Sequence, residues 1–160
     1  MDDKEYLNAI DKFRDVVYRV TLNYCKSRYD AEDVLQNTFL KLLKTDTEFK
    51  DEEHIRRWLI RVAVNECKNL FASFWRRNVG SLETLEGELV FTKQEESDLF
   101  EVVMKLPKKY RVVVHLFYYE GYATAEIAQI LHIKETTVRT QLVRARKSLK
   151  EQLKEVWFDE

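Results

Sequence analysis

The spacing of apolar positions predicts a chain built from helices. Between Tyr6 and Tyr24 the large apolar side chains recur at alternating steps of three and four residues, which is the repeat of an amphipathic helix. The stretch from Ala31 to Leu42 has the same repeat, and Asp30 is its predicted N-cap. A loop from Thr45 to Glu53 and a third helix from Glu53 to Trp75 complete the N-terminal half.

The second of these helices has two contrasting sides. Its apolar side is predicted to consist of Ala31, Val34, Leu35, Thr38, Phe39 and Leu42. Its other side carries Asp33, Gln36, Asn37, Leu40 and Leu43. Exposed leucines beside polar side chains are typical of a protein-docking surface. A wide apolar face that simply includes Leu40 and Leu43 remains an equally good interpretation of the pattern.

The third helix is predicted to have a cationic face opposite its apolar stripe. The stripe consists of Ile55, Leu59, Val62, Ala63, Leu70 and Phe74, and Glu66 lies close to it without an explanation from the sequence. The opposite face carries Arg57, Trp58, Arg61, Asn65, Lys68 and Asn69. Cationic, amide and aromatic groups can bind the phosphates, base edges and rings of an unstacked strand. Core packing is an equally good place for Trp58.

In the C-terminal half, residues 78–93 are acidic, contain two of the three glycines and predict a linker. A helix is predicted from Gln94 to Lys105, and Pro107 is expected to be the first residue of the next helix. The buried side of that next helix is predicted to be Tyr110, Val113, Val114 and Phe117. Gly121 fits the position just past its end.

The last part of the chain predicts a helix-turn-helix. One helix is expected from Thr124 to Leu131 and a second from about Glu135, joined by a turn that contains His132. The second helix would bury Val138, Leu142, Ala145 and Leu149, and would expose Thr136, Thr140, Arg144 and Lys147, with Arg139 and Arg146 beside the stripe. Such a layout also occurs in helical bundles with a solvated face. Hydroxyl groups followed by arginine and lysine favour DNA binding.

The distribution of charge supports two nucleic-acid surfaces, although 27 basic and 28 acidic side chains nearly cancel. Residues 54–77 carry six basic and one acidic side chain, and residues 105–154 carry eleven and four. The segments around these two regions are acidic. Only 3 glycines and 1 proline occur, which favours helices over strands and turns.

The sequence offers little for an enzyme, a metal site or a membrane span. It has no glycine-rich phosphate loop and no nucleophile elbow, and its three histidines lack metal-ligand spacing with either cysteine, so no cofactor is expected. Cys25 and Cys67 suit buried free thiols in a reducing compartment. The absence of a long apolar run or a signal peptide predicts a cytoplasmic chain without direct membrane contact.

With both halves in view, the chain resembles the sigma factors of bacterial RNA polymerase, specifically the small extracytoplasmic-function class. The resemblance lies in DAEDVLQNTFLKLL and RRWLIRVAVNECKN in the first half, and in LPKKYRVVVHLFYYEGYATAEIAQIL and TTVRTQLVRARKSL in the second. It implies an all-α fold with two small helical domains, residues 1–77 and 94–160, joined by a flexible acidic linker. It also implies a transcription initiation factor that directs core RNA polymerase to specific promoters.

The resemblance implies roles for matching positions. Asp33, Gln36, Asn37 and Leu40 would dock on the clamp of the largest polymerase subunit. The minus-ten promoter element would be read as its strands separate by Arg57, Trp58, Arg61, Asn65, Lys68 and Asn69, with a base flipped into a pocket near the Thr45–Glu53 loop. The minus-thirty-five element would be read by Thr136, Thr137, Arg139, Thr140, Gln141 and Arg144. An anti-sigma factor, commonly membrane-anchored in this class, is the further expected partner.

Some positions depart from the family pattern. Ala123 stands where a serine or threonine cap is common, so Thr124 is expected to cap one residue later. His132 replaces the usual turn glycine, and the Phe71–Trp75 segment replaces an arginine-rich helix end. Two rival functions share part of the pattern: a dimeric helix-turn-helix regulator, which does not account for residues 1–77, and a helical adaptor that binds polymerase without DNA.

Overall fold

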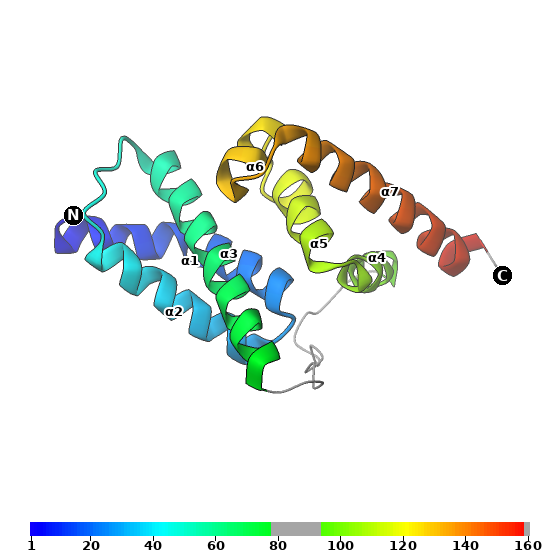
Figure 1. Cartoon of the computed structure of the whole chain (residues 1–160), viewed down its shortest axis with the longest axis horizontal. Coiled ribbons are helices and arrows are strands. Elements are labelled where there is room, and N and C mark those ends of the chain that lie inside the picture. Colours follow the sequence, from blue (N-terminus) through cyan, green and yellow to red (C-terminus); the bar gives the residue numbers. More distant parts are fainter. Residues whose placement is uncertain (78–93, 159–160) are drawn as a thin grey trace. The chain divides into compact units, whose positions relative to one another are not determined.

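Figure 1 shows the computed structural model of the chain, which describes the backbone of residues 1–77 and 94–158 and the side chains of residues 1–73 and 99–155. Every regular element in these ranges is a helix, as the apolar spacing predicts. The described elements fall into two compact units, one with α1 to α3 and the other with α4 to α7. The predicted linker, residues 78–93, lies outside the described residues, and so does the side chain of Phe74.

The first unit begins with α1 (Asp3–Cys25), whose N-terminus is closed by a reciprocal capping box. The Glu5 N–H donates to Asp2 Oδ1 at 2.8 Å, and the Asp2 N–H donates to Glu5 Oε2 at 3.0 Å. The helix ends at Lys26, which has a left-handed backbone with φ 57°. It therefore extends beyond the predicted Tyr6 and Tyr24 at both ends, because the capping residues lie outside its apolar stripe.

The second helix, α2 (Arg28–Lys44), is capped by Ser27 and not by Asp30, so the predicted N-cap is wrong. Ser27 has an extended backbone, and its hydroxyl accepts the Asp30 N–H at 3.3 Å. Asp30 lies instead in the first turn, where a carboxylate interacts favourably with the helix dipole. Both Ser27 and Asp30 have a side-chain oxygen that could cap the helix. Ser27 is the N-cap because its backbone is extended, whereas Asp30 is already helical.

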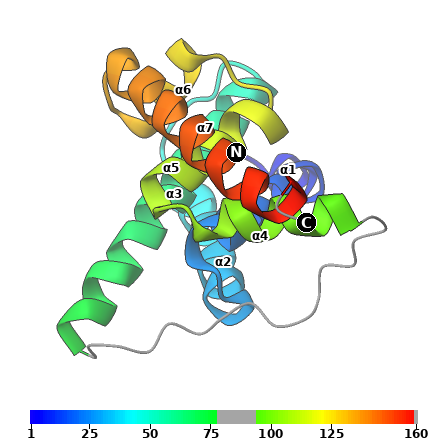
Figure 2. The same ribbon diagram turned by 90° about the vertical axis from the view of Figure 1, so that its right-hand side faces the viewer.

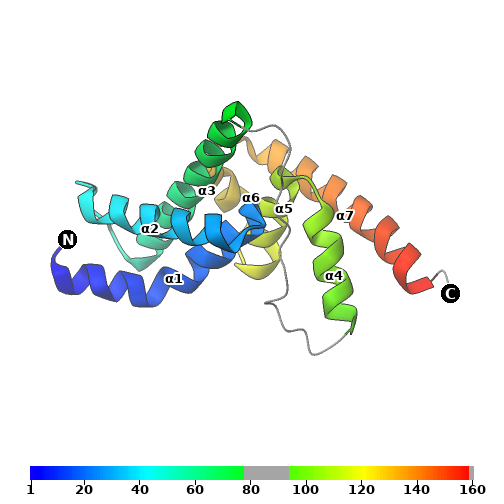
Figure 3. The same cartoon turned by 90° about the horizontal axis from the view of Figure 1, so that it is seen from below.

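The third helix, α3 (Glu52–Arg77), begins one residue earlier than predicted. The carboxylate of Asp51 accepts the His54 N–H at 2.7 Å and so closes the start of the helix. The connecting loop therefore ends at Asp51 instead of Glu53. Figure 3 shows α1 and α2 running side by side in opposite directions, with α3 crossing them.

The core of the first unit lies where these three helices meet. It is formed by Ala9, Phe13, Val17, Leu35, Phe39, Leu42, Leu59 and Ala63. All six residues predicted for the apolar side of α2 are buried, which confirms that prediction. The predicted stripe of α3 is only partly correct: Leu59 and Ala63 are buried, whereas Ile55, Val62 and Leu70 are half-buried. A second line on α3, formed by Ile60, Val64 and Cys67, is also buried, and of these three only Cys67 was predicted to be buried.

The two cysteines are free and buried, as predicted, and they contact each other between α1 and α3. The two thiols share a hydrogen bond, with 3.4 Å between Cys25 Sγ and Cys67 Sγ. This hydrogen bond is the largest cause that raises the pKa of the Cys67 thiol far above its ordinary value, followed by burial. Because reactivity requires a thiolate, Cys67 is an inert packing residue at neutral pH.

The second unit is organised around its last helix. Its elements are α4 (Gln94–Lys105), α5 (Lys108–Val114), the π-helix η1 (His115–Tyr119), α6 (Thr124–Leu131) and α7 (Glu135–Phe158). α4, α5 and α6 all pack against α7 (Figure 2). The bounds of α4 and α6 are those predicted from the sequence.

Two details of α5 and η1 differ from the sequence expectation. Pro107 precedes the first helical residue and is the N-cap, with φ −54° and ψ 146°. The helix then widens into η1, where the Glu120 N–H donates to His115 O at 3.1 Å. Gly121 follows with φ 75°, which confirms its predicted place just past the helix end. Val113 and Val114 are buried as predicted, whereas Tyr110 and Phe117 are half-buried.

Candidate nucleic-acid interface

The helix-turn-helix is formed by α6, a three-residue turn and α7. His132 ends α6 in a left-handed conformation with φ 55° and ψ 45°, and the Ile133 N–H donates to Ala128 O at 3.1 Å. Val138, Leu142 and Ala145 bury one side of α7, and Leu149 is half-buried. The predicted outward residues, Thr136, Thr140, Arg144 and Lys147, are all exposed, and so is Arg139, which was predicted to lie beside the stripe. One face of α7 is thus free to enter a groove of DNA.

The start of α7 is tied to the start of α6. The Thr124 hydroxyl donates to Glu135 Oε1 at 3.0 Å, and Arg139 Nη2 donates to the same oxygen at 2.7 Å. Thr124 therefore does not cap α6, so that expectation is wrong. The Ala123 N–H donates instead to Glu126 Oε1 at 3.0 Å, which supplies half of a capping box.

Two residues predicted to contact bases are less accessible than the others. Thr137 and Gln141 are half-buried, and Gln141 Oε1 is buried without a hydrogen-bond partner. Because both lie beside the buried stripe of α7, only Thr136, Arg139, Thr140 and Arg144 of the predicted set are fully on its exposed face. Val143, an exposed apolar residue with 62% of its surface accessible, joins that face and was not predicted.

Arg146 is held by aromatic side chains of the same unit. Its Nε donates to Tyr118 Oη at 2.6 Å, and its guanidinium lies 5.5 Å from the centre of the Phe117 ring. Arg144, two residues earlier, is exposed and points to the opposite side of the helix. In the RAR segment, residues 144–146, Arg144 therefore faces solvent, whereas Arg146 contacts aromatic side chains of its own unit.

On α3, the predicted cationic face is largely exposed. Arg61, Asn65, Lys68 and Asn69 are exposed, whereas Arg57 is half-buried and its Nε donates to Glu53 Oε1 at 3.1 Å. The four exposed residues lie along one side of the helix, with Asn65 four residues after Arg61, and Lys68 and Asn69 three and four residues after Asn65. This side can follow a strand of nucleic acid, with Arg57 at its N-terminal end.

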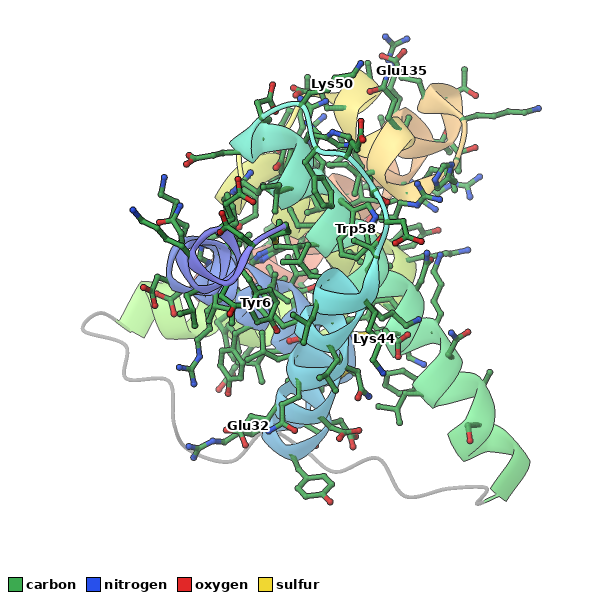
Figure 4. All side chains as sticks on the ribbon, turned by 90° about the vertical axis from the view of Figure 1, so that its left-hand side faces the viewer. Tyr6, Glu32, Lys44, Lys50, Trp58 and Glu135 are labelled. Carbon is green, nitrogen blue, oxygen red and sulfur yellow. The ribbon has the colours of Figure 1, made fainter. Side chains whose placement is uncertain are left out.

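Trp58 is half-buried and packs under the loop between α2 and α3 (Figure 4). The Phe49 ring meets Trp58 edge-on with 5.6 Å between ring centres, and it meets His54 at 5.1 Å. Trp58 also contacts the core of the first unit. Trp58 therefore packs against the core and also has an accessible part. Both predictions for it, core packing and stacking against a base, remain possible.

A cavity of about 690 Å³ lies between the start of α1, the same loop and the start of α3. Phe13, Phe49 and Ile55 line it on the apolar side, and Asp46 and Glu48 are among its acidic residues. Carboxylates accept hydrogen bonds from the amino groups of bases, and apolar walls pack against base rings. The cavity lies beside the loop near which the family resemblance implies a pocket for a flipped base.

The exposed side of α2 combines polar and apolar groups. Asp33 and Gln36 are exposed, Asn37 is half-buried, and Leu40 and Leu43 have 48% and 55% of their surface accessible. The interpretation of both leucines as part of a wide apolar face is therefore wrong. Two leucines that face solvent beside polar groups match the predicted docking surface.

The described residues provide no site for a metal ion, since they contain no group of three or more histidine, cysteine, aspartate or glutamate side chains suited to one. In the same ranges, no helix has both the length and the apolar character of a membrane span.

Comparisons with known proteins cover both units. The family model for sigma-70 region 2 matches residues 9–77, and that for sigma-70 region 4 matches residues 97–149. The ECF RNA polymerase sigma-E factor of Haemophilus influenzae is 26% identical over 170 residues, covering 95% of this chain and 89% of the relative. The ECF RNA polymerase sigma factor SigW of Bacillus subtilis is 24% identical, covering 97% and 92%.

Solved structures agree on the fold. The sigma factor RpoE of Bartonella quintana, crystallised with the anti-sigma factor NepR, aligns with a TM-score of 0.82 at 19% identity, covering 94% of this chain and 98% of that chain. CnrH, in complex with the cytosolic domain of CnrY, aligns with a TM-score of 0.67 at 20% identity, covering 95% and 89%. The two family matches, in this order and over most of the sequence, show that the chain belongs to the sigma-70 family as an extracytoplasmic-function sigma factor, a promoter-specific transcription initiation factor.

Proposed function

We propose that three exposed helix faces divide the work of initiation among them. The face of α7 reads the minus-thirty-five element, the face of α3 reads the minus-ten element as its strands separate, and the outer side of α2 docks on the clamp of the largest polymerase subunit. The observation that carries this proposal is that α3 and α7 each bury one side and expose a side rich in cationic and amide or hydroxyl groups.

At the minus-thirty-five element, α7 enters the major groove. Arg139 and Arg144 donate to guanine edges or phosphates. Thr136 lies in the first turn of the helix, where the dipole favours phosphate, and Thr140 follows one turn later on the same face. Thr137 and Gln141 complete the set if their half-buried side chains turn outward on binding. Gln141 has a buried oxygen without a partner, which lowers the cost of that turn.

At the minus-ten element, Arg61 and Lys68 neutralise phosphates while Asn65 and Asn69 bond to base edges. Arg57 and Trp58 stand at the end of this face nearest the loop. A base that leaves the stack enters the cavity beside Phe49, which spares the protein from reading a stacked base. The domains are accordingly residues 1–77 for polymerase docking and minus-ten recognition, and residues 94–160 for minus-thirty-five recognition.

Docking on the polymerase uses Asp33, Gln36, Asn37 and Leu40. The chain itself catalyses no reaction, and transcript synthesis belongs to the polymerase.

We place the protein in the cytoplasm, where an anti-sigma factor that covers these faces would hold it inactive. Membership of the family and the complex of RpoE with the anti-sigma factor NepR support that partner.

Run-off transcription tests the proposal. Purified core RNA polymerase is supplied with promoter fragments, with and without the chain. We expect promoter-specific transcripts only when the chain is added, and loss of these transcripts with Arg61→Ala and Arg144→Ala. Unchanged transcription by both variants would reject the DNA roles and favour a helical adaptor. Tight binding to duplex DNA without polymerase would favour a dimeric regulator.

A further inference from the structure

Glu135 connects the two helices of the helix-turn-helix through a single oxygen atom. It is the first residue of α7 (labelled in Figure 4), and its Oε1 accepts from Thr124 Oγ1 at 3.0 Å and from Arg139 Nη2 at 2.7 Å. Thr124 is the first residue of α6. The carboxylate is therefore fixed from one side by α6, and it fixes Arg139 on the other.

This arrangement has little consequence for stability but a direct one for the position of Arg139. The side chains of Arg139 and Glu135 are 65% and 38% exposed, and exposed ion pairs contribute little to folding. An unrestrained arginine samples many rotamers, whereas this guanidinium is held before DNA arrives. Glutamate four residues before arginine is also the favourable order for a helical pair. Restricting a side chain in its binding position lowers the cost of binding.

We propose that Glu135 is a positioning residue that determines the base specificity of Arg139. The carboxylate holds the guanidinium toward one base pair of the minus-thirty-five element, and its negative charge disfavours the neighbouring phosphates as alternative partners. Without it, Arg139 binds phosphate wherever it can and discriminates less. This inference rests on the proposed function, because it requires α7 to lie in the major groove.

The test uses the full chain with core polymerase and a set of promoters that carry every single-base substitution in the minus-thirty-five element. Transcript yields are compared for the original chain, Glu135→Ala, Glu135→Gln, Arg139→Ala and the double variant. Glu151→Gln removes an exposed negative charge farther along α7 and is the matched control. Thermal unfolding of each variant reports on folding separately.

Arg139→Ala is expected to flatten the preference at one base pair, since a good arginine–guanine contact is worth roughly 5- to 150-fold. Glu135→Ala should lower the preference at that same base pair by at least about threefold, and should add nothing in the Arg139→Ala background. Glu135→Gln keeps an oxygen acceptor but loses the negative charge, and should give a preference between those of the original chain and Glu135→Ala. Glu151→Gln should leave all preferences unchanged.

The proposal is overturned if Glu135→Ala changes no preference, changes a different base pair, or acts additively with Arg139→Ala. An equal rise in transcription from every promoter would also overturn it, since that result indicates simple repulsion of DNA. If Arg139→Ala itself leaves every preference intact, the proposed role of Arg139 in DNA binding fails. Failure of the Arg139 role can be told apart from failure of the Glu135 role, because it appears in the Arg139→Ala variant, which retains Glu135.

Discussion

Lys41 on α2 forms an ion pair with Glu66 on α3, through Lys41 Nζ and Glu66 Oε1. The Glu66 side chain is only 16% exposed, whereas that of Lys41 is 55% exposed. The pair explains why an acidic residue lies close to the apolar stripe of α3, a position for which the sequence offered no reason. It also links the helix proposed to dock on polymerase to the helix proposed to bind DNA.

Removing this lysine should destabilise the chain slightly. Lys41→Met leaves the half-buried Glu66 carboxylate without its cation, and we expect a loss of about 0.5–1 kcal/mol in the free energy of unfolding. Lys44→Met is the matched control, because Lys44 is also exposed in the last turn of α2. Urea unfolding followed by circular dichroism measures both. Equal losses in the two variants would show that the ion pair contributes nothing.

Stability should fall at alkaline pH because of the Cys67 thiol. Its pKa is raised in the folded chain by the hydrogen bond shared with Cys25 and by burial, whereas the unfolded chain ionises near the ordinary value of 9.0. The unfolded state therefore loses its proton first, and the stability present below pH 9 is lost as pH rises above it. We expect a loss of about 1.4 kcal/mol between pH 8 and pH 10. Unfolding under reducing conditions should show no such component in Cys67→Ala, and an identical pH dependence in both chains would contradict the assignment.

The two arginines of the RAR segment should have separate effects. Arg144→Ala removes an exposed cation from the outward face of α7 and should lower transcription from promoters with an intact minus-thirty-five element by roughly 5- to 150-fold. Arg146→Ala removes contacts to Tyr118 and Phe117 and should cost about 1 kcal/mol of stability without changing promoter preference. Run-off transcription and thermal unfolding of both variants make the comparison. If Arg146→Ala changed promoter preference and Arg144→Ala changed only stability, the side of α7 that carries Arg146 would be the one that enters the groove, which would contradict the proposal.

The docking surface should depend on Leu40. Leu40→Ala removes apolar area that would be buried on polymerase, and we expect core binding to weaken by about 5- to 30-fold. Leu7→Ala on α1 is the matched control, because Leu7 is also an exposed leucine, with 60% of its surface accessible. Fluorescence anisotropy with labelled chain and purified core polymerase measures both affinities. An equal effect of the two substitutions would argue against a docking site on α2.

Elements set by local patterns were predictable from the sequence. The bounds of α4 and α6, the buried side of α2 and the turn glycine Gly121 all follow from apolar spacing and backbone preferences. His132, which replaces the usual turn glycine, has the left-handed backbone that glycine adopts most easily, with φ 55°. In each case the deciding interactions lie within a few residues along the chain.

Features set by contacts between distant residues were not predictable. The buried line of Ile60, Val64 and Cys67 has helical spacing that is visible in the sequence, yet only the packing around α3 shows that its buried face is wider than the predicted stripe. The bond from Thr124 to Glu135 joins residues on different helices. A sequence pattern supplies neither the partner nor the direction of such a side chain.

For the site residues, the sequence predicted which helix face they occupy but not the direction of every side chain. The pattern placed Arg61, Asn65, Lys68 and Asn69 on one exposed face, which the structure agrees with. It did not reveal that Gln141 turns toward the protein. Helical periodicity gives the angle of a side chain around the helix axis, and a residue at the border of the buried stripe can turn either way. Contacts of these residues with DNA stay a prediction.

Mapping of transcript start sites tests the central claim, that one chain reads two promoter elements while it is bound to core polymerase. Core enzyme and a library of random DNA are incubated with and without the chain, and the DNA upstream of each chain-dependent start is sequenced. We expect two conserved blocks, one near minus ten and one near minus thirty-five, with Arg144→Ala weakening only the second. Chain-dependent starts with a single conserved block, or no chain-dependent starts, would contradict that claim.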